Sequence, residues 1–226
     1  MTTANSSVGS RLEVSLSRFT ILLGGALEPT DRLKAQVAGT RAIAADSGIL
    51  HAPLLGLEVE LWIGDFDSTS IEDQERFKDL PREIFPVAKD KTDGELAVEA
   101  ALDRGATDLV LAGGLGGQAD HALGNLMLAS RLARLNLPVL VTTGLEEAYP
   151  LHPGSLTIGV PPGSRVSIVP LGPLKALSIQ GVRWPLVRRD VSAGSTLTLS
   201  NEAMSGTVGV TLEAGEALFL AYPKVV

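Results

Sequence analysis

Residues 109–120 read Leu-Val-Leu-Ala-Gly-Gly-Leu-Gly-Gly-Gln-Ala-Asp, an apolar run followed by a glycine-rich turn. The apolar run 109–112 predicts a buried strand, and the helical pattern of residues 120–135 follows the turn. In such an arrangement, backbone amides of the turn can approach an anion at the start of the helix. This strand, turn and helix therefore predict an α/β fold that can bind a phosphate group.

The same alternation of strands and helices extends over the N-terminal part of the chain. Short apolar runs predict buried strands at residues 19–23, 41–45, 61–63, 84–87, 109–112 and 139–141. The clearest other helix is predicted over residues 93–104, with Asp93 and Glu95 in its first turn and Gly105 as its stop. The alternation predicts a doubly wound, mostly parallel sheet with helices on both faces.

The pattern changes after Pro150, where no helical period appears. Short strands separated by glycine and proline are predicted at residues 156–160, 166–169, 176–179, 196–199, 208–212 and 217–221. Strands of this length with frequent turns favour a small all-β sandwich or barrel. We therefore expect two domains, an α/β catalytic domain over residues 18–147 and a β-sandwich domain over residues 151–226.

Composition and charge exclude several classes of protein. The 226 residues include no cysteine, which excludes disulfide bonds and cysteine-based zinc sites. A net charge of -7 without a dense basic run argues against a nucleic-acid surface. Residues 1–17 lack the apolar stretch of a signal peptide, and no run is long enough to span a membrane. We therefore expect a cytoplasmic protein without nucleic-acid or membrane partners.

Aspartates follow four of the predicted strands. They are Asp46, Asp65, Asp67, Asp90, Asp93 and Asp120. One aspartate after a strand is commonly a helix cap or turn residue, but the carboxyl ends of parallel strands meet at one edge of a sheet. Carboxylates gathered there repel one another unless a cation lies between them, and oxygen ligands suit magnesium. The sequence therefore predicts a site for magnesium and a nucleotide polyphosphate.

Two other nucleotide sites are disfavoured. Residues 114–119 match the Gly-x-Gly-x-x-Ala dinucleotide fingerprint, but residues 138–143 lack the acidic residue that this site needs after the next strand. The chain also contains no P-loop motif. The three histidines, His51, His121 and His152, have no metal-binding spacing, and only His121 lies beside one of the aspartates.

Four segments, in this order and spacing, resemble motifs of thiamine pyrophosphokinases. They are Ala45-Asp46-Ser47-Gly48, Ile63-Gly64-Asp65-Phe66-Asp67-Ser68, Lys89-Asp90-Lys91-Thr92-Asp93, and Gly113-Gly114 followed by Asp120-His121-Ala122-Leu123-Gly124-Asn125. The resemblance covers residues 19–222 and includes Gly181-Val182-Arg183-Trp184-Pro185-Leu186 and Leu199-Ser200-Asn201-Glu202 in the predicted sandwich. Single motifs are weak, whereas the ordered set is specific.

The resemblance implies transfer of the pyrophosphoryl group of ATP to the hydroxyl of thiamine, which gives thiamine diphosphate and AMP. It implies catalytic roles for Asp46, Asp65, Asp67 and Asp93, with Asp65, Asp67 and Asp93 as magnesium ligands. The co-substrate ATP would be bound by Lys89, Asp90, Gly114, Gln118, Asp120 and Asn125. Gln118 replaces the usual arginine of the family and removes a positive charge from the glycine-rich turn, for which Lys89 and Lys91 offer a partial replacement.

The resemblance also implies a homodimer with shared active sites. The sandwich of the second subunit would complete the thiamine pocket, with a tryptophan stacked on the pyrimidine. The corresponding residues here are Ser178, Trp184, Ser200 and Asn201. An aromatic ring beside a cationic ligand is also favourable on physical grounds.

Two alternatives remain open from the sequence. A related pyrophosphokinase acting on another hydroxymethyl heterocycle, such as a pterin, would share the N-terminal chemistry but need not keep Trp184 with Ser200 and Asn201. A non-catalytic nucleotide or thiamine sensor would have lost turnover with the arginine at position 118.

Overall fold

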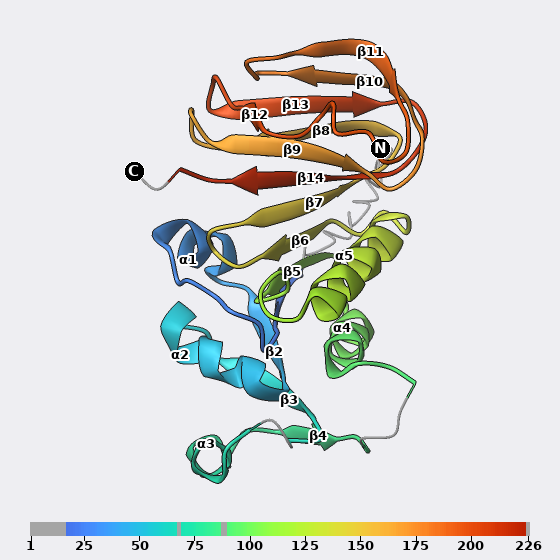
Figure 1. Cartoon of the computed structure of the whole chain (residues 1–226). Helices are drawn as coiled ribbons and strands as arrows, with labels where there is room; N and C mark the ends of the chain where they lie inside the picture. Colours follow the sequence, from blue (N-terminus) through green and yellow to red (C-terminus); the bar gives the residue numbers. More distant parts are fainter. Residues whose placement is uncertain (1–16, 67–68, 87–89, 225–226) are drawn as a thin grey trace, which may run out of the picture.

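The computed structural model describes residues 17–66, 69–86 and 90–224. Its strands form a ten-stranded sheet and a four-stranded sheet (Figure 1). The larger sheet has the order β12-β9-β14-β7-β6-β5-β1-β2-β3-β4. Within the described ranges no helix combines the length and the apolar character that crossing a bilayer requires.

Six parallel strands form one half of the large sheet. They are β1 (Arg18–Leu22), β2 (Arg41–Ala45), β3 (Val59–Gly64), β4 (Arg82–Ile84), β5 (Asp108–Ala112) and β6 (Val139–Thr142). Their register is parallel throughout, for example with Ile21 opposite both Ile43 and Leu111. Five of the strands, β1, β2, β3, β5 and β6, begin and end within two residues of the predicted limits. The segment predicted as 84–87 lies earlier, at β4, and residue 87 lies outside the described residues.

Helices cover both faces of this parallel part. They are α1 (Asp31–Val37), η1 (Asp46–His51), α2 (Ala52–Leu55), α3 (Ile71–Arg76), α4 (Asp93–Asp103) and α5 (Ala119–Ala133). Alternate side chains of each strand enter opposite cores: Ile21 packs with α4 and α5, whereas Leu22 packs with α1, η1 and α2. Figure 1 shows α1 and α2 on one face and α4 and α5 on the other. The prediction of a doubly wound, mostly parallel sheet is confirmed.

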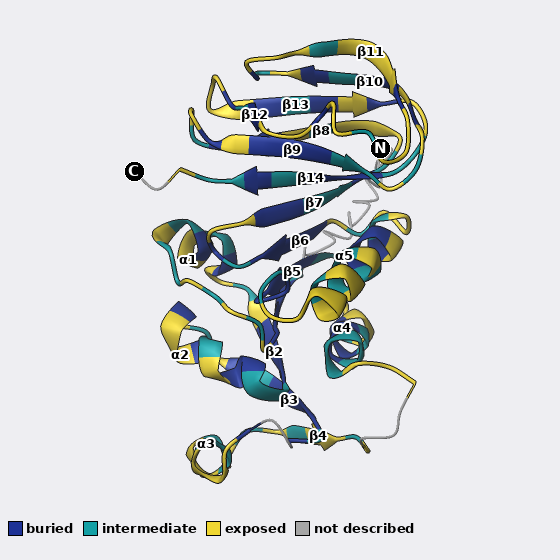
Figure 2. Cartoon of the chain, viewed as in Figure 1, coloured by how far each residue is buried: buried dark blue, intermediate teal, exposed yellow. Residues whose placement is uncertain are grey.

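The C-terminal half folds as two antiparallel layers. Four of its strands extend the large sheet: β7 (Glu147–Leu151), β9 (Arg165–Pro170), β12 (Asn201–Glu202) and β14 (Ala217–Tyr222). The others, β8 (Gly154–Gly159), β10 (Leu174–Gln180), β11 (Leu186–Val191) and β13 (Thr207–Leu212), form the small sheet in the order β11-β10-β13-β8. A shared core that includes Ile168, Leu177, Val210 and Phe219 lies between the layers. Figure 2 shows these buried faces and the exposed edge strand β11.

One local prediction in this half is wrong, and three strands were not predicted. Residues 196–199 form turns rather than a strand, although their Thr-Leu-Thr-Leu alternation is typical of one. The buried Thr198 hydroxyl donates to the Ile168 carbonyl, so this segment bonds to the edge of β9 without joining the sheet ladder. Strands β7, β11 and β12 were not predicted: β7 falls in the expected linker, β11 is mostly exposed and rich in arginine, and β12 has only two residues.

A buried ion pair joins the two halves. The carboxylate of Glu147, which is 1% exposed, accepts hydrogen bonds from Arg32 Nε at 2.5 Å and from Arg32 NH2 at 2.8 Å. Gln36 of α1 and Tyr149 of β7 donate to the same carboxylate at 2.7 and 2.9 Å. The Glu147 hydrogen bond raises the pKa of Arg32, and burial raises the pKa of Tyr149. A fully hydrogen-bonded buried carboxylate of this kind fixes α1 against β7.

Candidate active site

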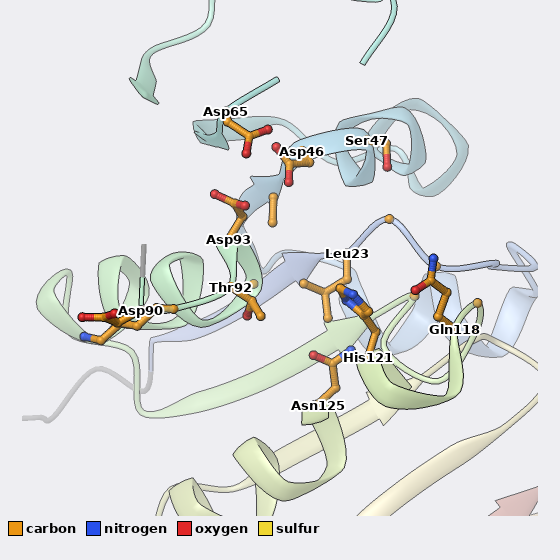
Figure 3. A pocket seen from close by; sticks show the side chains of 18 residues that line it. Leu23, Asp46, Ser47, Asp65, Asp90, Thr92, Asp93, Gln118, His121 and Asn125 are labelled. Carbon is orange, nitrogen blue, oxygen red and sulfur yellow. The ribbon is translucent and has the colours of Figure 1, made fainter. Parts of the chain in front are cut away.

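A cavity of about 760 Å³ lies at the carboxyl ends of the parallel strands. Loops after β1, β2, β3 and β5 line it, together with the segment before α4 and the first turns of α4 and α5 (Figure 3). In open α/β sheets this edge is where ligands bind. The structure therefore brings together the strand ends at which the sequence predicts a site.

Two glycine-rich loops form one wall of the cavity. A Cβ atom on Gly25 would lie 2.2 Å from the carbonyl oxygen of Gly113, and one on Gly116 would lie 2.5 Å from the amide nitrogen of Ala26. Any side chain at these positions would separate the loops. The side chain of Asn125 in α5 donates to the Gly114 carbonyl at 2.9 Å, which holds the turn against its own helix. The glycine turn thus lies next to a helix N-terminus, an arrangement that favours an anionic phosphate.

Three carboxylates face one another across the cavity from this wall. Figure 3 shows the side chains of Asp46, Asp65 and Asp93 pointing toward one another. They come from the residue after β2, the residue after β3 and the first residue of α4. Burial, then the charge and hydrogen bond of Asp93, then the charge of Asp65 raise the pKa of Asp46 to about 7. The cavity therefore concentrates negative charge at one point.

The geometry of Asp46 fits a cation ligand. Its Oδ1 atom is buried and has no hydrogen-bond partner among the described residues. A Cβ atom at Gly64 would lie 1.8 Å from this oxygen, so only glycine leaves room for it. Asp46 itself has a φ of 44°, an unusual conformation for a residue other than glycine. A hard divalent cation would satisfy the oxygen and offset the repulsion between the carboxylates.

The described side chains do not by themselves form a closed metal site. No group of three or more histidine, cysteine, aspartate or glutamate residues within the described ranges has the geometry to hold a metal ion. Asp67, predicted as a ligand, lies outside the described residues. Magnesium commonly keeps several water ligands and shares others with substrate phosphates, so an incomplete set of protein ligands still fits this ion.

The start of α4 shapes the side of the cavity next to the carboxylates. Thr92 caps the helix by accepting a hydrogen bond from the Glu95 amide at 3.2 Å, and Asp93 follows at the first helical position. The Asp93 carboxylate therefore lies at the positive end of the helix dipole. Lys91 also lines the cavity, but its ammonium group pairs with Glu99 at 2.6 Å and 2.7 Å. Lys91 is therefore engaged by a carboxylate and is poorly placed to replace the family's arginine.

The predicted co-substrate residues divide into three groups. Asp90, Gln118 and Asn125 line the cavity, although Asp90 lies apart from the three facing carboxylates in Figure 3. Gly114 and Asp120 are not among the lining residues: the Gly114 carbonyl is bonded to Asn125, and Asp120 accepts from the His121 amide at 2.9 Å. Lys89 lies outside the described residues. The binding roles of all of these residues stay predictions.

Several lining residues were not predicted from the sequence. They are Leu23, Ser47, Thr92 and His121, with His121 noted only as a neighbour of Asp120. His51 was also missed as a contributor: its Nε2 lies 2.9 Å from the Gly25 carbonyl and ties the first glycine loop to the end of η1. The adjacent glycines 24 and 25 were the sequence signal from which the glycine wall could have been predicted.

The residues predicted to bind thiamine all lie on the C-terminal layers. Trp184 is 57% exposed, and Asn201 is buried beside it. Ser178 accepts a hydrogen bond from the Arg188 amide, while the Ser200 amide donates to Ser167. None of the described residues that line the cavity belongs to these layers. Within one chain, the predicted thiamine residues and the facing carboxylates therefore do not share a wall.

Comparison with known proteins identifies the family. Residues 36–141 match the catalytic domain of thiamin pyrophosphokinase, and residues 155–217 match its vitamin B1 binding domain. Thiamine pyrophosphokinase of Bacillus subtilis (strain 168) is 30% identical over 167 residues, which are 71% of this chain and 77% of the relative. The chain belongs to the thiamine pyrophosphokinase family.

Solved structures of thiamine pyrophosphokinases share its fold. The crystal structure from Geobacillus thermodenitrificans matches with a TM-score of 0.77 and 27% identity, covering 92% of this chain and 98% of that one. The structure from Bacillus subtilis matches with a TM-score of 0.82 and 24% identity, covering 92% and 100%. The chain is thus an ATP-dependent diphosphotransferase, a thiamine pyrophosphokinase. These matches give no support to the pterin enzyme or the non-catalytic sensor.

Proposed function

We propose that the cavity binds the polyphosphate of ATP together with magnesium, and that thiamine attacks the β-phosphorus there. The observation that carries this proposal is the group of three facing carboxylates opposite a glycine wall in one cavity. Phosphoryl transfer depends mainly on alignment and on neutralising charge at the phosphoryl oxygens. The glycine wall would align the polyphosphate, and the wall of carboxylates would bind the ion that neutralises its charge.

The acidic wall binds the metal and handles the proton. We assign Asp65, Asp67 and Asp93 as magnesium ligands, with Asp46 completing the catalytic set. Bound magnesium would neutralise charge on the transferred and leaving phosphates. One carboxylate of the set accepts the proton of the thiamine hydroxyl as the new O–P bond forms, while the bond between the β-phosphorus and the oxygen of the α-phosphate breaks and AMP leaves.

The glycine wall orients the polyphosphate. Residues of the turn after β5 line the cavity next to the N-terminus of α5, and Asn125 holds the turn in place. Gln118, at the N-cap of α5, makes no capping hydrogen bond through its side chain, so its amide group is available to a phosphate oxygen. Asp90, Lys89, Gly114 and Asp120 complete the proposed co-substrate set.

Thiamine is held by a second copy of the chain. The cavity is lined by residues of the α/β half, whereas Trp184, Ser178, Ser200 and Asn201 lie on the C-terminal layers. A two-fold dimer would bring the exposed Trp184 ring of one subunit to the cavity of its partner. We therefore propose a cytoplasmic homodimer with two shared active sites. Residues 18–147 form its catalytic domain, and residues 151–226 form its thiamine-binding and dimerisation domain.

Product analysis tests the proposal. The protein is incubated with thiamine and ATP, with and without magnesium, and the products are separated by chromatography. Thiamine diphosphate and AMP, formed in equal amounts and only with magnesium, would support it. Formation of ADP would instead indicate a simple kinase, and binding without turnover would indicate a sensor.

A further inference from the structure

The fully buried Trp62 of β3 touches the backbone of the catalytic set. Its indole Nε1 donates a hydrogen bond to the carbonyl oxygen of Asp46 at 2.8 Å. An indole nitrogen can only donate, so the direction of this bond is fixed by chemistry. Trp62 also precedes Gly64, the last residue of β3, by two positions, and Asp65, the residue after β3, by three. One residue is thus linked to both neighbouring strand ends of the acidic wall.

The indole of Trp62 bonds to Asp46, whose backbone conformation is energetically unfavourable. Asp46 has a φ of 44°, in the left-handed region that favours glycine. Such a conformation persists only where surrounding contacts maintain it. Here the indole holds the carbonyl of Asp46 from one side, while Gly64 leaves space for its carboxylate on the other. Without the indole N–H, the Asp46 carbonyl would lose this partner and Asp46 could rotate toward an ordinary conformation.

The same indole ring contacts the loop that carries Asp65. The Phe66 ring meets it edge-on, with centroids 4.6 Å apart and an interplanar angle of 85°. Phe66 also has a left-handed backbone, with a φ of 62°. The Arg82 guanidinium lies over the indole, 4.6 Å from its centroid, and Phe77 packs 6.0 Å away. These neighbours hold the ring in one orientation.

We infer that Trp62 is a positioning residue that fixes the separation of Asp46 and Asp65, and with it the affinity of the acidic wall for magnesium. The inference rests on the proposed magnesium site. Trp62 does not line the cavity, so it acts only through the residues that it holds. Groups that orient metal ligands typically change metal affinity or activity by about 10–100-fold when they are removed.

The substitution Trp62→Phe removes the donor and keeps an aromatic ring. We expect the magnesium concentration for half-maximal rate to rise about tenfold, with the KM for thiamine changed less than about twofold. The magnesium-induced rise in Tm should shrink in parallel, which gives a readout independent of turnover. Phe77→Leu is the matched control, because it loosens the same aromatic cluster without touching the hydrogen bond. It should lower Tm and leave the magnesium dependence unchanged.

Spectroscopy of the unsubstituted Trp62 decides the question if Trp62→Phe does not fold. The chain has two tryptophans, so Trp184→Phe leaves Trp62 as the source of the remaining indole signal. In protein labelled with ¹⁵N-tryptophan, the Trp62 N–H resonance should exchange slowly and shift on addition of magnesium with a non-hydrolysable ATP analogue.

The outcomes separate this inference from the proposed function. A Trp62 resonance that does not respond to ligands that raise Tm would overturn the positioning role, as would equal effects of Trp62→Phe and Phe77→Leu on magnesium dependence. A wild-type protein whose turnover and Tm are both indifferent to magnesium would overturn the proposed site, and this inference with it.

Discussion

Asn201 holds the backbone of Trp184 with two hydrogen bonds. Its Oδ1 accepts from the Trp184 amide at 3.1 Å, and its Nδ2 donates to the Trp184 carbonyl at 2.8 Å. Asn201 is only 9% exposed, whereas Trp184 is 57% exposed. The indole of Trp184 therefore extends from a fixed backbone into solvent. An exposed tryptophan on an anchored backbone is well suited to stacking on a ligand.

Replacing Asn201 should weaken thiamine binding specifically. Asn201→Ala removes both hydrogen bonds to Trp184, so we expect the KM for thiamine to rise about tenfold while the KM for ATP stays within about twofold. Steady-state kinetics with each substrate varied in turn provide the measurement. An equal rise in both constants would indicate a general loss of structure instead.

The carboxylate of Asp65 should be essential for turnover but not for folding. Asp65→Asn removes charge from a cavity wall rather than a contact in the core, so activity should fall more than about 100-fold with little change in Tm. Asp79→Asn, at an exposed loop position, is the matched control and should behave as wild type. Near-normal activity of Asp65→Asn in limiting magnesium would remove Asp65 from the ligand set.

Stability should depend on pH through Asp46. Its pKa rises from 3.8 to about 7 on folding, so its stabilising contribution is complete below the lower value and is lost as pH rises through the higher one. Without magnesium, Tm should therefore fall between about pH 4 and pH 8 more steeply than in Asp46→Asn, and magnesium should raise Tm most at the upper end. Thermal melts across this range test the prediction. Parallel curves for wild type and Asp46→Asn would contradict it.

Restoring the family's arginine should strengthen ATP binding. Gln118→Arg places a guanidinium beside the glycine turn, where a charge-assisted bond to phosphate should lower the KM for ATP about three- to tenfold. Lys91 is paired with Glu99 and does not supply this charge. Gln118→Lys is the control, because it adds the positive charge without the planar guanidinium, which can bond two phosphate oxygens at once. An unchanged KM in both variants would show that backbone amides already satisfy the phosphate.

Mixed dimers should recover activity from two inactive variants. Asp65→Asn and Trp184→Ala are prepared separately, shown to be impaired, and mixed under conditions of subunit exchange. One site of a mixed dimer then carries both lesions, while the other combines an intact Asp65 with an intact Trp184 from its partner. Activity should rise above the average of the parents. If exchange is verified and activity stays at that average, Trp184 serves its own subunit and the shared site is wrong.

The sequence was most informative where local pattern and burial coincide. Strands β1, β2 and β5 are buried after their first residue, and apart from Thr20 their buried residues are apolar and easy to recognise. Strand β7 was missed because its buried Glu147 and its Pro150 are not typical of a strand. A buried glutamate in a strand is stable only with a partner such as Arg32. Sequence spacing alone could not reveal this partner, which is 115 residues away.

The candidate site was predictable at its strand ends and not between them. Asp46, Asp65 and Asp93 could be found because each follows or starts a regular element, and topology brings such positions together. The contribution of Trp62 could not, because a tryptophan in an apolar strand resembles any core residue. Its hydrogen bond depends on the left-handed backbone of Asp46, a property of the folded chain that no spacing encodes.

The pairing of β6 with β7 has a consequence for how the chain can be divided. Val141 lies opposite Ala148 and Thr142 opposite Glu147, so the hydrogen-bonded ladder continues from the catalytic half into the C-terminal half. A cut at this junction would leave two open sheet edges and a buried Glu147 without Arg32, and open edges promote aggregation. We therefore expect the two halves to melt together in a single transition. Exchanging one half between related proteins would therefore also require a matching β6–β7 ladder and a matching Arg32–Glu147 pair.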